Sequence, residues 1–229
     1  RRQHSEDQLR RFIADASHEL RTPLASIRGY AQLSLGENAP MTPTQERAFD
    51  RIASESTRMA DLVEDLLLLA RLDAGQRLRR EPVDLTMLAI DAVSDVHATD
   101  PAHTWLLDLR EHDAVEVTGD DNRLRQVVAN LMRNARTHTP PGTTVTLTLR
   151  REGDSAVIEV ADDGPGIAPE ISERLFERFA RADVSRNRDA GSTGLGLSIA
   201  QAIVSAHDGT IDVQSEPGRT AFTVRLPVA

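Results

Sequence analysis

Residues Phe12 to Leu24 read FIADASHELRTPL, and their periodicity sets the first helix of the chain. The apolar residues recur every three or four positions, which places them in one stripe of an α-helix. His18 lies roughly opposite this stripe, so the pattern predicts an exposed imidazole, a competent nucleophile near neutral pH. Glu19 could take or hold an imidazole proton, and Pro23 predicts a helix bend beside His18. Without such neighbours, a lone helical histidine is an ordinary surface or core residue.

Composition and charge describe a soluble chain and argue against several classes of function. Its 229 residues, 39% hydrophobic and 28% charged, suit one large or two modest domains. A net charge of -9 argues against nucleic-acid binding, and the absence of cysteine excludes disulfides and thiolate metal sites. No apolar run approaches the ~18 residues of a membrane span, so we expect no membrane contact by this fragment. The charged start at Arg1 and Arg2 indicates a piece of a longer protein.

A second amphipathic helix is predicted to begin with Thr42 as N-cap, Pro43 in the first helical position and Gln45 completing a capping box. Its apolar residues step by threes and fours in a heptad seam. This seam consists of Phe49, Ile52, Met59, Val63, Leu66 and Ala70. The run 66–69 widens the apolar face beyond what one antiparallel helix covers. We therefore expect two helical hairpins to pair into a dimeric four-helix bundle; the alternative is a monomeric hairpin packed on the second domain.

The polar stretch after this helix predicts a domain boundary. We assign residues 1–76 to the helical hairpin, 77–82 to a linker and 83–229 to a second domain. In the second domain, Asp84 and Asp120 are expected to cap helices that run to about residues 97 and 134. Further helices are expected near 169–179 and at 195–206, and strands at 104–109, 114–118, 143–151, 156–161, 210–214 and 220–226. This order predicts an α/β sandwich, a mixed sheet with helices on one face.

Two clusters in the second domain could bind a nucleotide. Asn130 and Asn134 lie four residues apart and so on one helix face, where two carboxamide oxygens could ligate Mg²⁺, although such a pair is often plain polar surface. Asp162 follows a strand and could accept the exocyclic amine of a purine, while Gly164 and Gly166 let the backbone approach a ligand.

A third cluster is the glycine-rich stretch 191–197, which precedes an apolar helix and could present backbone N–H groups to phosphate. It lacks the G-K-[ST] of a Walker loop and does not follow the first strand of a βαβ unit, which argues against a dinucleotide site. One or two of the arginines between the second and third clusters could neutralise a triphosphate. These arginines are Arg174, Arg178, Arg181, Arg186 and Arg188.

Five motifs occur in an order that resembles the sensor histidine kinases of bacterial two-component systems. They are HELRTPL at 18–24, NLxxNA at 130–135, DxGxG at 162–166, LFERF at 175–179 and GLGL at 194–197. The resemblance covers residues 12 to 227. It implies a dimerisation and histidine-phosphotransfer bundle followed by a catalytic domain of the kind shared with Hsp90, gyrase and MutL.

The resemblance also implies roles for the residues of the first two motifs. His18 would be the autophosphorylated histidine, Glu19 would help to deprotonate or orient it, and Thr22 would matter for removing phosphate from the partner. Asn134 would bind Mg²⁺, with Asn130 assisting at the phosphates of ATP.

In the later motifs, Asp162 would recognise adenine, Gly164 and Gly166 would shape its pocket, and Gly194 and Gly196 would hinge a lid over ATP. The chain departs from the family at residues 137 and 138, a threonine and a histidine where many members have lysine and an aromatic residue. We therefore expect an arginine, such as Arg178, to contact the phosphates. His138 is either a ligand contact or a helix-end residue.

The implied function is an ATP-dependent protein-histidine kinase core, a homodimer that passes phosphoryl to an aspartate of a response-regulator receiver domain and also acts as its phosphatase. It would lie in the cytoplasm, with a missing N-terminal part anchored in the inner membrane. Two alternatives stay open. One is a GHKL-fold ATPase that drives conformational change, and the other is a binding module, either an idle scaffold or chiefly a phosphatase.

Overall fold

The computed structural model describes residues 23, 26–27, 29–30, 42–73, 77–179 and 194–228. The chain divides into two compact units, Arg1–Ala70 and Arg71–Ala229. Within the described ranges, no helix combines the length and hydrophobicity that a membrane crossing requires. The predicted domain boundaries at residues 76 and 83 stay predictions.

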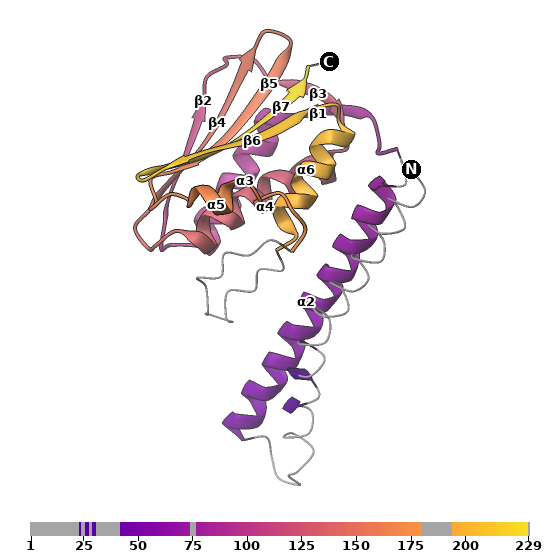
Figure 1. The fold of residues 1–229 in the computed structure, drawn as a ribbon, viewed down its shortest axis with the longest axis vertical. Coiled ribbons are helices and arrows are strands. Elements are labelled where there is room, and N and C mark those ends of the chain that lie inside the picture. Colours follow the sequence, from indigo (N-terminus) through magenta and orange to yellow (C-terminus); the bar gives the residue numbers. More distant parts are fainter. Residues whose placement is uncertain are drawn as a thin grey trace. The chain divides into compact units, whose positions relative to one another are not determined.

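The described part of the first unit consists mainly of helix α2 (Pro43–Asp73), whose last three residues belong to the second unit (Figure 1). Its first turn has the predicted capping box: Thr42 N–H donates to Gln45 Oε1 at 2.7 Å, and Gln45 N–H donates to Thr42 Oγ1 at 3.4 Å. Both contacts satisfy amides that a helix start would leave unpaired. The predicted start of the helix is thus confirmed.

Helix α2 buries one apolar row and leaves another in solvent. The buried apolar residues are Ala48, Leu62, Leu66, Leu68 and Leu69. Phe49, Val63 and Leu67 are 47%, 42% and 51% exposed. Of the predicted seam, Leu66 is therefore buried, whereas Phe49 and Val63 form part of an open apolar face.

The second unit contains a five-stranded mixed sheet in the order β2-β4-β5-β7-β6. Its strands are β2 (Thr104–Leu109), β4 (Thr144–Glu152), β5 (Ser155–Asp162), β6 (Thr210–Glu216) and β7 (Arg219–Pro227). Helices cover one face of this sheet (Figure 1): α3 (Leu85–Thr99), α4 (Asp121–His138) and α6 (Gly196–Ala206). β2 is parallel to β4, and the other neighbouring strands are antiparallel. The predicted α/β layer arrangement is confirmed.

Aspartates begin α3 and α4, as the sequence predicted. Asp84 accepts the amide of Thr86 at 2.8 Å, and Asp120 accepts the amide of Arg123 at 3.2 Å. A carboxylate at a helix N-terminus satisfies free N–H groups and complements the helix dipole. Helix α4 continues four residues beyond the predicted end at Asn134, to His138.

Two segments differ from the prediction. Residues 81 and 82, assigned to the linker, lie in strand β1 (Glu81–Asp84), which pairs with β3 (Glu116–Gly119). Pro82 is tolerated there because β1 is an edge strand. The predicted helix 169–179 is wrong beyond α5 (Pro169–Ser172), since the amides of residues 174, 175 and 177 donate to carbonyls three residues back and so form turns.

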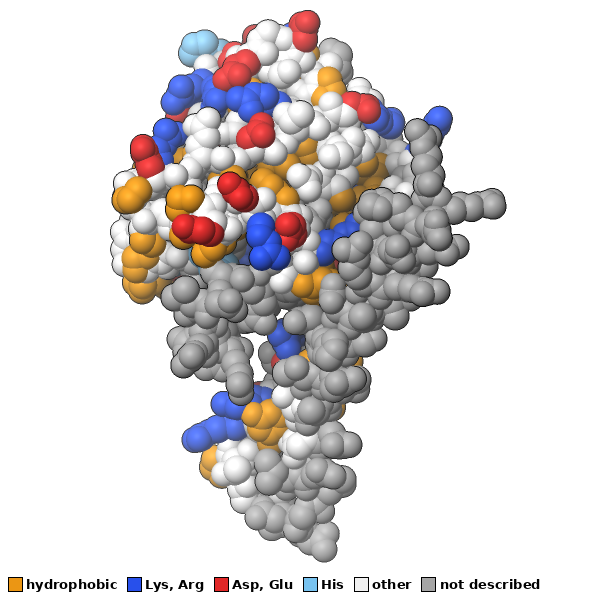
Figure 2. Space-filling model, viewed as in Figure 1, with side chains coloured by type: hydrophobic (Ala, Val, Ile, Leu, Met, Phe, Trp, Pro, Cys, Tyr) orange, Lys and Arg blue, Asp and Glu red, His pale blue; other side chains and the backbone are white. Residues whose placement is uncertain are grey.

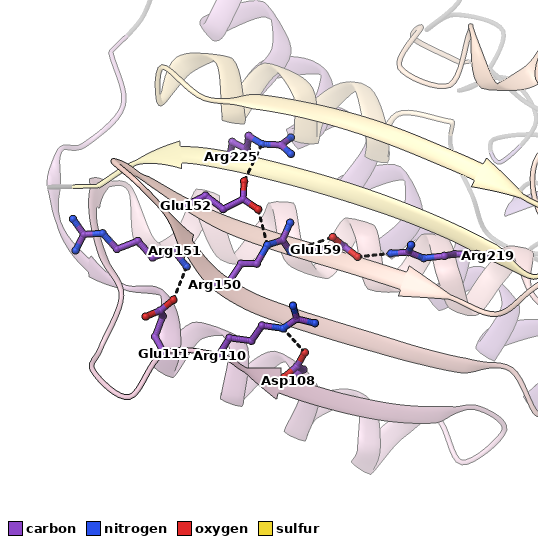
Figure 3. Close-up of polar contacts among 9 residues, drawn as sticks. All are labelled: Asp108, Arg110, Glu111, Arg150, Arg151, Glu152, Glu159, Arg219 and Arg225. Atoms are coloured by element: carbon purple, nitrogen blue, oxygen red, sulfur yellow. Dashed lines mark hydrogen bonds and ion pairs between the residues drawn. The ribbon is translucent and has the colours of Figure 1, made fainter.

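The helix-free face of the sheet carries a network of ion pairs, the outward lattice (Figure 3). Arg150 binds Glu152 at 2.7 Å and Glu159 at 3.1 Å, and Arg219 binds Glu159 at 2.8 Å. Arg225 joins through Glu152 at 3.9 Å, and Asp108 and Arg110 form a separate pair at 2.9 Å on the same face. Exposed pairs contribute at most about 1 kcal/mol each. On the face seen in Figure 2, arginines and acidic side chains are likewise interspersed.

His207 ties the end of α6 to the start of α4. The ring is 2% exposed; Nδ1 donates to the Ile203 carbonyl at 2.8 Å, and Nε2 accepts the Asp120 amide at 2.9 Å. Because a carbonyl only accepts and an amide only donates, the ring is the neutral tautomer protonated at Nδ1. A Cβ at Gly119 would lie 2.8 Å from this ring, so glycine is needed beside it.

Replacing His207 by alanine is expected to lower the free energy of unfolding by about 2–4 kcal/mol, because the change leaves a cavity and an unpaired buried amide. Urea unfolding followed by the fluorescence of Trp105, the single tryptophan and a buried residue, measures the loss. His97→Ala, at an exposed position of α3, is the matched control and should change stability by less than about 0.5 kcal/mol. Equal effects of the two changes would contradict the structural role of His207.

Candidate functional site

The helix-covered face of the sheet has polar residues at one end. Two neighbouring cross-strand rows are apolar throughout: Leu147–Val160–Phe222–Val213 and Leu149–Ile158–Val224–Ile211. The next row, which we call the polar row, runs Val145–Asp162–Thr220–Ser215 across β4, β5, β7 and β6. Polar groups at core positions require hydrogen-bond partners or a ligand. The strand register thus places the candidate site at one end of the sheet.

Asp162 is the charged member of the polar row and is 7% exposed. Its Oδ1 accepts the amide of Gly164 at 3.0 Å. Burial raises the pKa of the Asp162 carboxyl above its ordinary value, against the opposing effect of the Gly164 hydrogen bond. The neighbouring Asp163 instead accepts the Thr144 amide at 2.8 Å, which braces two strand ends. Asp162 is therefore the carboxylate available to a ligand, because alternate strand residues face opposite sides.

The two glycines after Asp162 are required by the packing of the protein itself. A Cβ at Gly164 would lie 2.7 Å from Asp162 Oδ1, and a Cβ at Gly166 would lie 2.8 Å from the Glu216 carbonyl oxygen. Gly166 also has a φ of 83°, which side chains other than glycine rarely adopt. The predicted part of both glycines in shaping the nucleotide pocket stays a prediction; the structure shows that both also allow a compact loop directly after Asp162.

The structure joins the predicted asparagine and glycine clusters. Asn130 is buried, and its Nδ2 donates to the Gly196 carbonyl at 3.0 Å, which ties α4 to the first residue of α6. Gly194 has a φ of 69° and its carbonyl accepts the amide of Phe179 at 3.0 Å. Asn134 lies one turn after Asn130 on the same helix face and is half-buried. Asn130 thus has a positioning contact that the sequence did not reveal.

His138 and Arg178 lie between the asparagine and glycine clusters in the sequence. His138 is the last residue of α4, on the face of Asn134; it is exposed overall, and partial desolvation of its imidazole lowers the pKa, which favours the neutral ring. It is a helix-end residue; a ligand contact stays a prediction. Arg178 is paired with Asp73 at 2.7 Å within the second unit. His18, Glu19 and Thr22 lie outside the described residues, as do Arg181, Arg186 and Arg188.

Sequence reasoning missed Thr220 and Ser215. Thr220 is 3% exposed and faces Asp162 across the strand pair, and the two hydroxyl oxygens lie 2.8 Å apart. The inward positions of both strands are otherwise apolar, so the signal was a hydroxyl residue among them. It follows Ile211 and Val213 in β6 and precedes Phe222 in β7.

The donor set fits a magnesium nucleotide. Among the described residues, no three His, Cys, Asp or Glu side chains are grouped to hold a metal ion. Mg²⁺ needs few protein ligands when phosphates and water supply the others, and a single amide oxygen such as that of Asn134 suffices. A buried carboxylate with a free acceptor position fits the amine of a purine base.

Comparison with known proteins places these features in a family. Residues 8–75 match the His Kinase A (phospho-acceptor) domain, and residues 119–229 match the histidine kinase-, DNA gyrase B- and HSP90-like ATPase family. The chain is 55% identical to the probable sensor histidine kinase TcrY of Mycobacterium tuberculosis, over 99% of the chain and 47% of TcrY. It thus spans about half the length of this relative.

Solved structures agree with the fold. Histidine kinase AdeS of Acinetobacter baumannii has a TM-score of 0.74 at 27% identity, over 92% of this chain and 97% of AdeS. Full-length ShkA in complex with AMPPNP has a TM-score of 0.71 at 30% identity, over 94% of this chain and 45% of ShkA. The chain therefore belongs to the sensor histidine kinases of two-component systems and comprises the two domains of their kinase core.

Proposed function

We propose that the chain is an ATP-dependent protein-histidine kinase core that autophosphorylates His18 and passes the phosphoryl group to an aspartate of a response-regulator receiver domain. The observation that carries this proposal is the polar row, a buried carboxylate and two hydroxyls at the end of the otherwise apolar, helix-covered face of the ATPase sheet. The similarity to ShkA, solved with an ATP analogue, supports ATP as the nucleotide. Bound ATP supplies the phosphoryl group, and Mg²⁺ offsets the charge of its phosphates.

In this proposal, different residues of the second unit bind the base and the metal ion of Mg·ATP and position the helix α6. Asp162 accepts a hydrogen bond from the purine amine, with Thr220 opposite it, and the loop of Gly164 and Gly166 holds the carboxylate in place. Asn134 holds Mg²⁺. Asn130 positions the start of α6, and with it Gly194 and Gly196, which hinge the lid. Most of the rate then comes from positioning and charge neutralisation, since phosphoryl transfer needs little covalent help from protein.

The first unit supplies the acceptor. A nitrogen of the neutral His18 imidazole forms a bond to the γ-phosphorus of ATP while the bond from that phosphorus to the β–γ bridging oxygen breaks, and ADP leaves. Glu19 accepts or orients the imidazole proton. Thr22 serves removal of phosphate from the regulator, which makes the core a phosphatase as well. Arg178 is the proposed phosphate contact and would exchange Asp73 for phosphate. Residues 1–76 and 83–229 are the proposed domains.

The open apolar face of α2 supports a homodimer. Phe49, Val63 and Leu67 are more than a third exposed in the single chain, and large exposed apolar residues at helical spacing favour a partner helix. A second copy of the hairpin would complete a four-helix bundle. The core would work in the cytoplasm, where ATP and receiver domains are found, with the anchoring in the cell membrane left to another part of the protein.

Incubation of the purified chain with Mg²⁺ and γ-labelled ATP tests the proposal. We expect label on the protein that is stable in base and lost in acid, as a phosphoramidate requires, and chase of that label onto a receiver domain. Steady release of phosphate from an unlabelled chain would contradict the kinase proposal and indicate a GHKL-fold ATPase instead. A chain with neither label nor phosphate release would be a binding module.

A further inference from the structure

Ser215 links the glycine loop to the polar row. Its Oγ accepts the amide of Ile167 at 2.8 Å, directly after the loop that holds Asp162. The same oxygen lies 2.8 Å from Thr220 Oγ1 on the neighbouring strand. One hydroxyl on β6 thus contacts both the loop that carries Asp162 and the strand residue that faces it.

The geometry limits what each hydroxyl can do. The Ile167 amide only donates, so it occupies one lone pair of Ser215 Oγ and leaves the hydroxyl hydrogen and a second lone pair for Thr220. When Ser215 donates to Thr220, the hydrogen of Thr220 is left for a further acceptor, and Asp162 is its cross-strand neighbour. A purine at Asp162 would meet a threonine whose hydroxyl is already oriented.

Backbone contacts place the same loop on the β6–β7 turn. The Gly218 amide donates to the Gly164 carbonyl at 3.0 Å, and Gly166 packs against the Glu216 carbonyl so closely that a Cβ would not fit. A shift at the end of β6 would therefore move the loop, and Asp162 with it.

We propose that Ser215 is a positioning residue for base recognition: its hydroxyl holds Thr220 and the Ile167 amide so that Asp162 and Thr220 meet the purine together. The inference rests on the proposed function, because it takes the polar row as the site of the base. Ser215 itself does not touch the nucleotide in this proposal, since it acts through Thr220 and the loop.

The test compares Ser215→Thr with Ser215→Val in the full chain. Both side chains are β-branched and suit a strand, and they have nearly the same shape, so folding is matched and only the hydroxyl differs. In calorimetric titration, the affinity of Ser215→Thr for Mg·ADP should lie within about twofold of the wild-type affinity. The affinity of Ser215→Val for Mg·ADP should be about fivefold to tenfold weaker, which is the effect of losing one hydrogen bond. Gln214→Ala, exposed on the same strand, should leave binding unchanged.

Two readouts separate positioning from general stability. With valine, the KM for ATP should rise while kcat stays near wild type, and hydrogen exchange at the Ile167 amide should accelerate about tenfold. Valine and threonine variants that bind Mg·ADP alike would overturn the inference while leaving the kinase proposal intact. If the wild-type chain did not bind Mg·ADP, the polar row would not be a nucleotide site, and both proposals would be contradicted.

Discussion

Replacing His18 by glutamine is expected to abolish the acid-labile label from γ-labelled ATP. Glutamine is polar and a good helix former, so it suits the helix that the sequence predicts around residue 18. Its amide nitrogen is not a nucleophile, whereas an imidazole nitrogen is. The loss should exceed about 100-fold, because no other group takes the place of the missing nucleophile.

The control for this change is His97→Gln, at an exposed position of α3 in the second unit. It should label like wild type, and His18→Gln should still bind Mg·ADP with unchanged affinity. If His18→Gln took up label as wild type does, the acceptor would be another of the seven histidines. Loss of both label and nucleotide binding would instead indicate damage to the fold.

Replacing Asp162 by asparagine should weaken Mg·ADP binding by about 10-fold to 100-fold. The carboxylate is the buried acceptor of the polar row, and a hydrogen bond to a charged group contributes about 1.5–3 kcal/mol. Asparagine keeps an oxygen for the Gly164 amide, so the loop should hold its shape. Calorimetric titration measures the affinity, and the label from ATP should fall in parallel.

The same substitution should not lower stability, and this separates a binding role from a structural one. Burial raises the pKa of Asp162, so at neutral pH the folded chain carries a desolvated carboxylate that the unfolded chain keeps in water. Asparagine removes this penalty. The variant should therefore melt at or above the wild-type temperature at neutral pH, and the difference should shrink as the pH falls through the raised pKa.

Asp163→Asn is the matched control, since Asp163 braces Thr144 on the neighbouring strand. It should leave Mg·ADP affinity within about threefold of wild type. A reversed result, in which Asp163→Asn lost binding and Asp162→Asn kept it, would exchange the roles assigned to the two aspartates.

Local signals in the sequence predicted much of the fold. The capping box of Thr42 and Gln45 and the caps Asp84 and Asp120 lie within three residues of the groups they satisfy, so a pattern rule can find them. The strand 104–109 was predicted to the residue, because alternation and flanking turns define it. Strand β1 was not predicted, because it contains Pro82, and an edge strand accepts a proline that a central strand would not.

The site could be predicted only in part, because its chemistry depends on strand register. Asp162 was visible as a carboxylate at a strand end, but Thr220 joins it only through the pairing of β5 with β7, segments more than fifty residues apart, and Ser215 follows through the β6–β7 pairing. The hydrogen bond of Asn130 to Gly196 is equally long-range. No periodicity within one segment reports either contact.

The outward lattice has a consequence for chemical control of the ATPase unit. The sequence contains no lysine, so every cation of the lattice is a guanidinium. A guanidinium keeps its charge at all accessible pH values and is not a substrate for lysine acylation. The hydrogen bond from Arg150 lowers the pKa of Glu152, which moves neutralisation of that carboxylate further into acid. Lysine acylation therefore cannot remove the positive charges of this face, and the Arg150–Glu152 pair keeps its negative charge further into acid than an ordinary glutamate would.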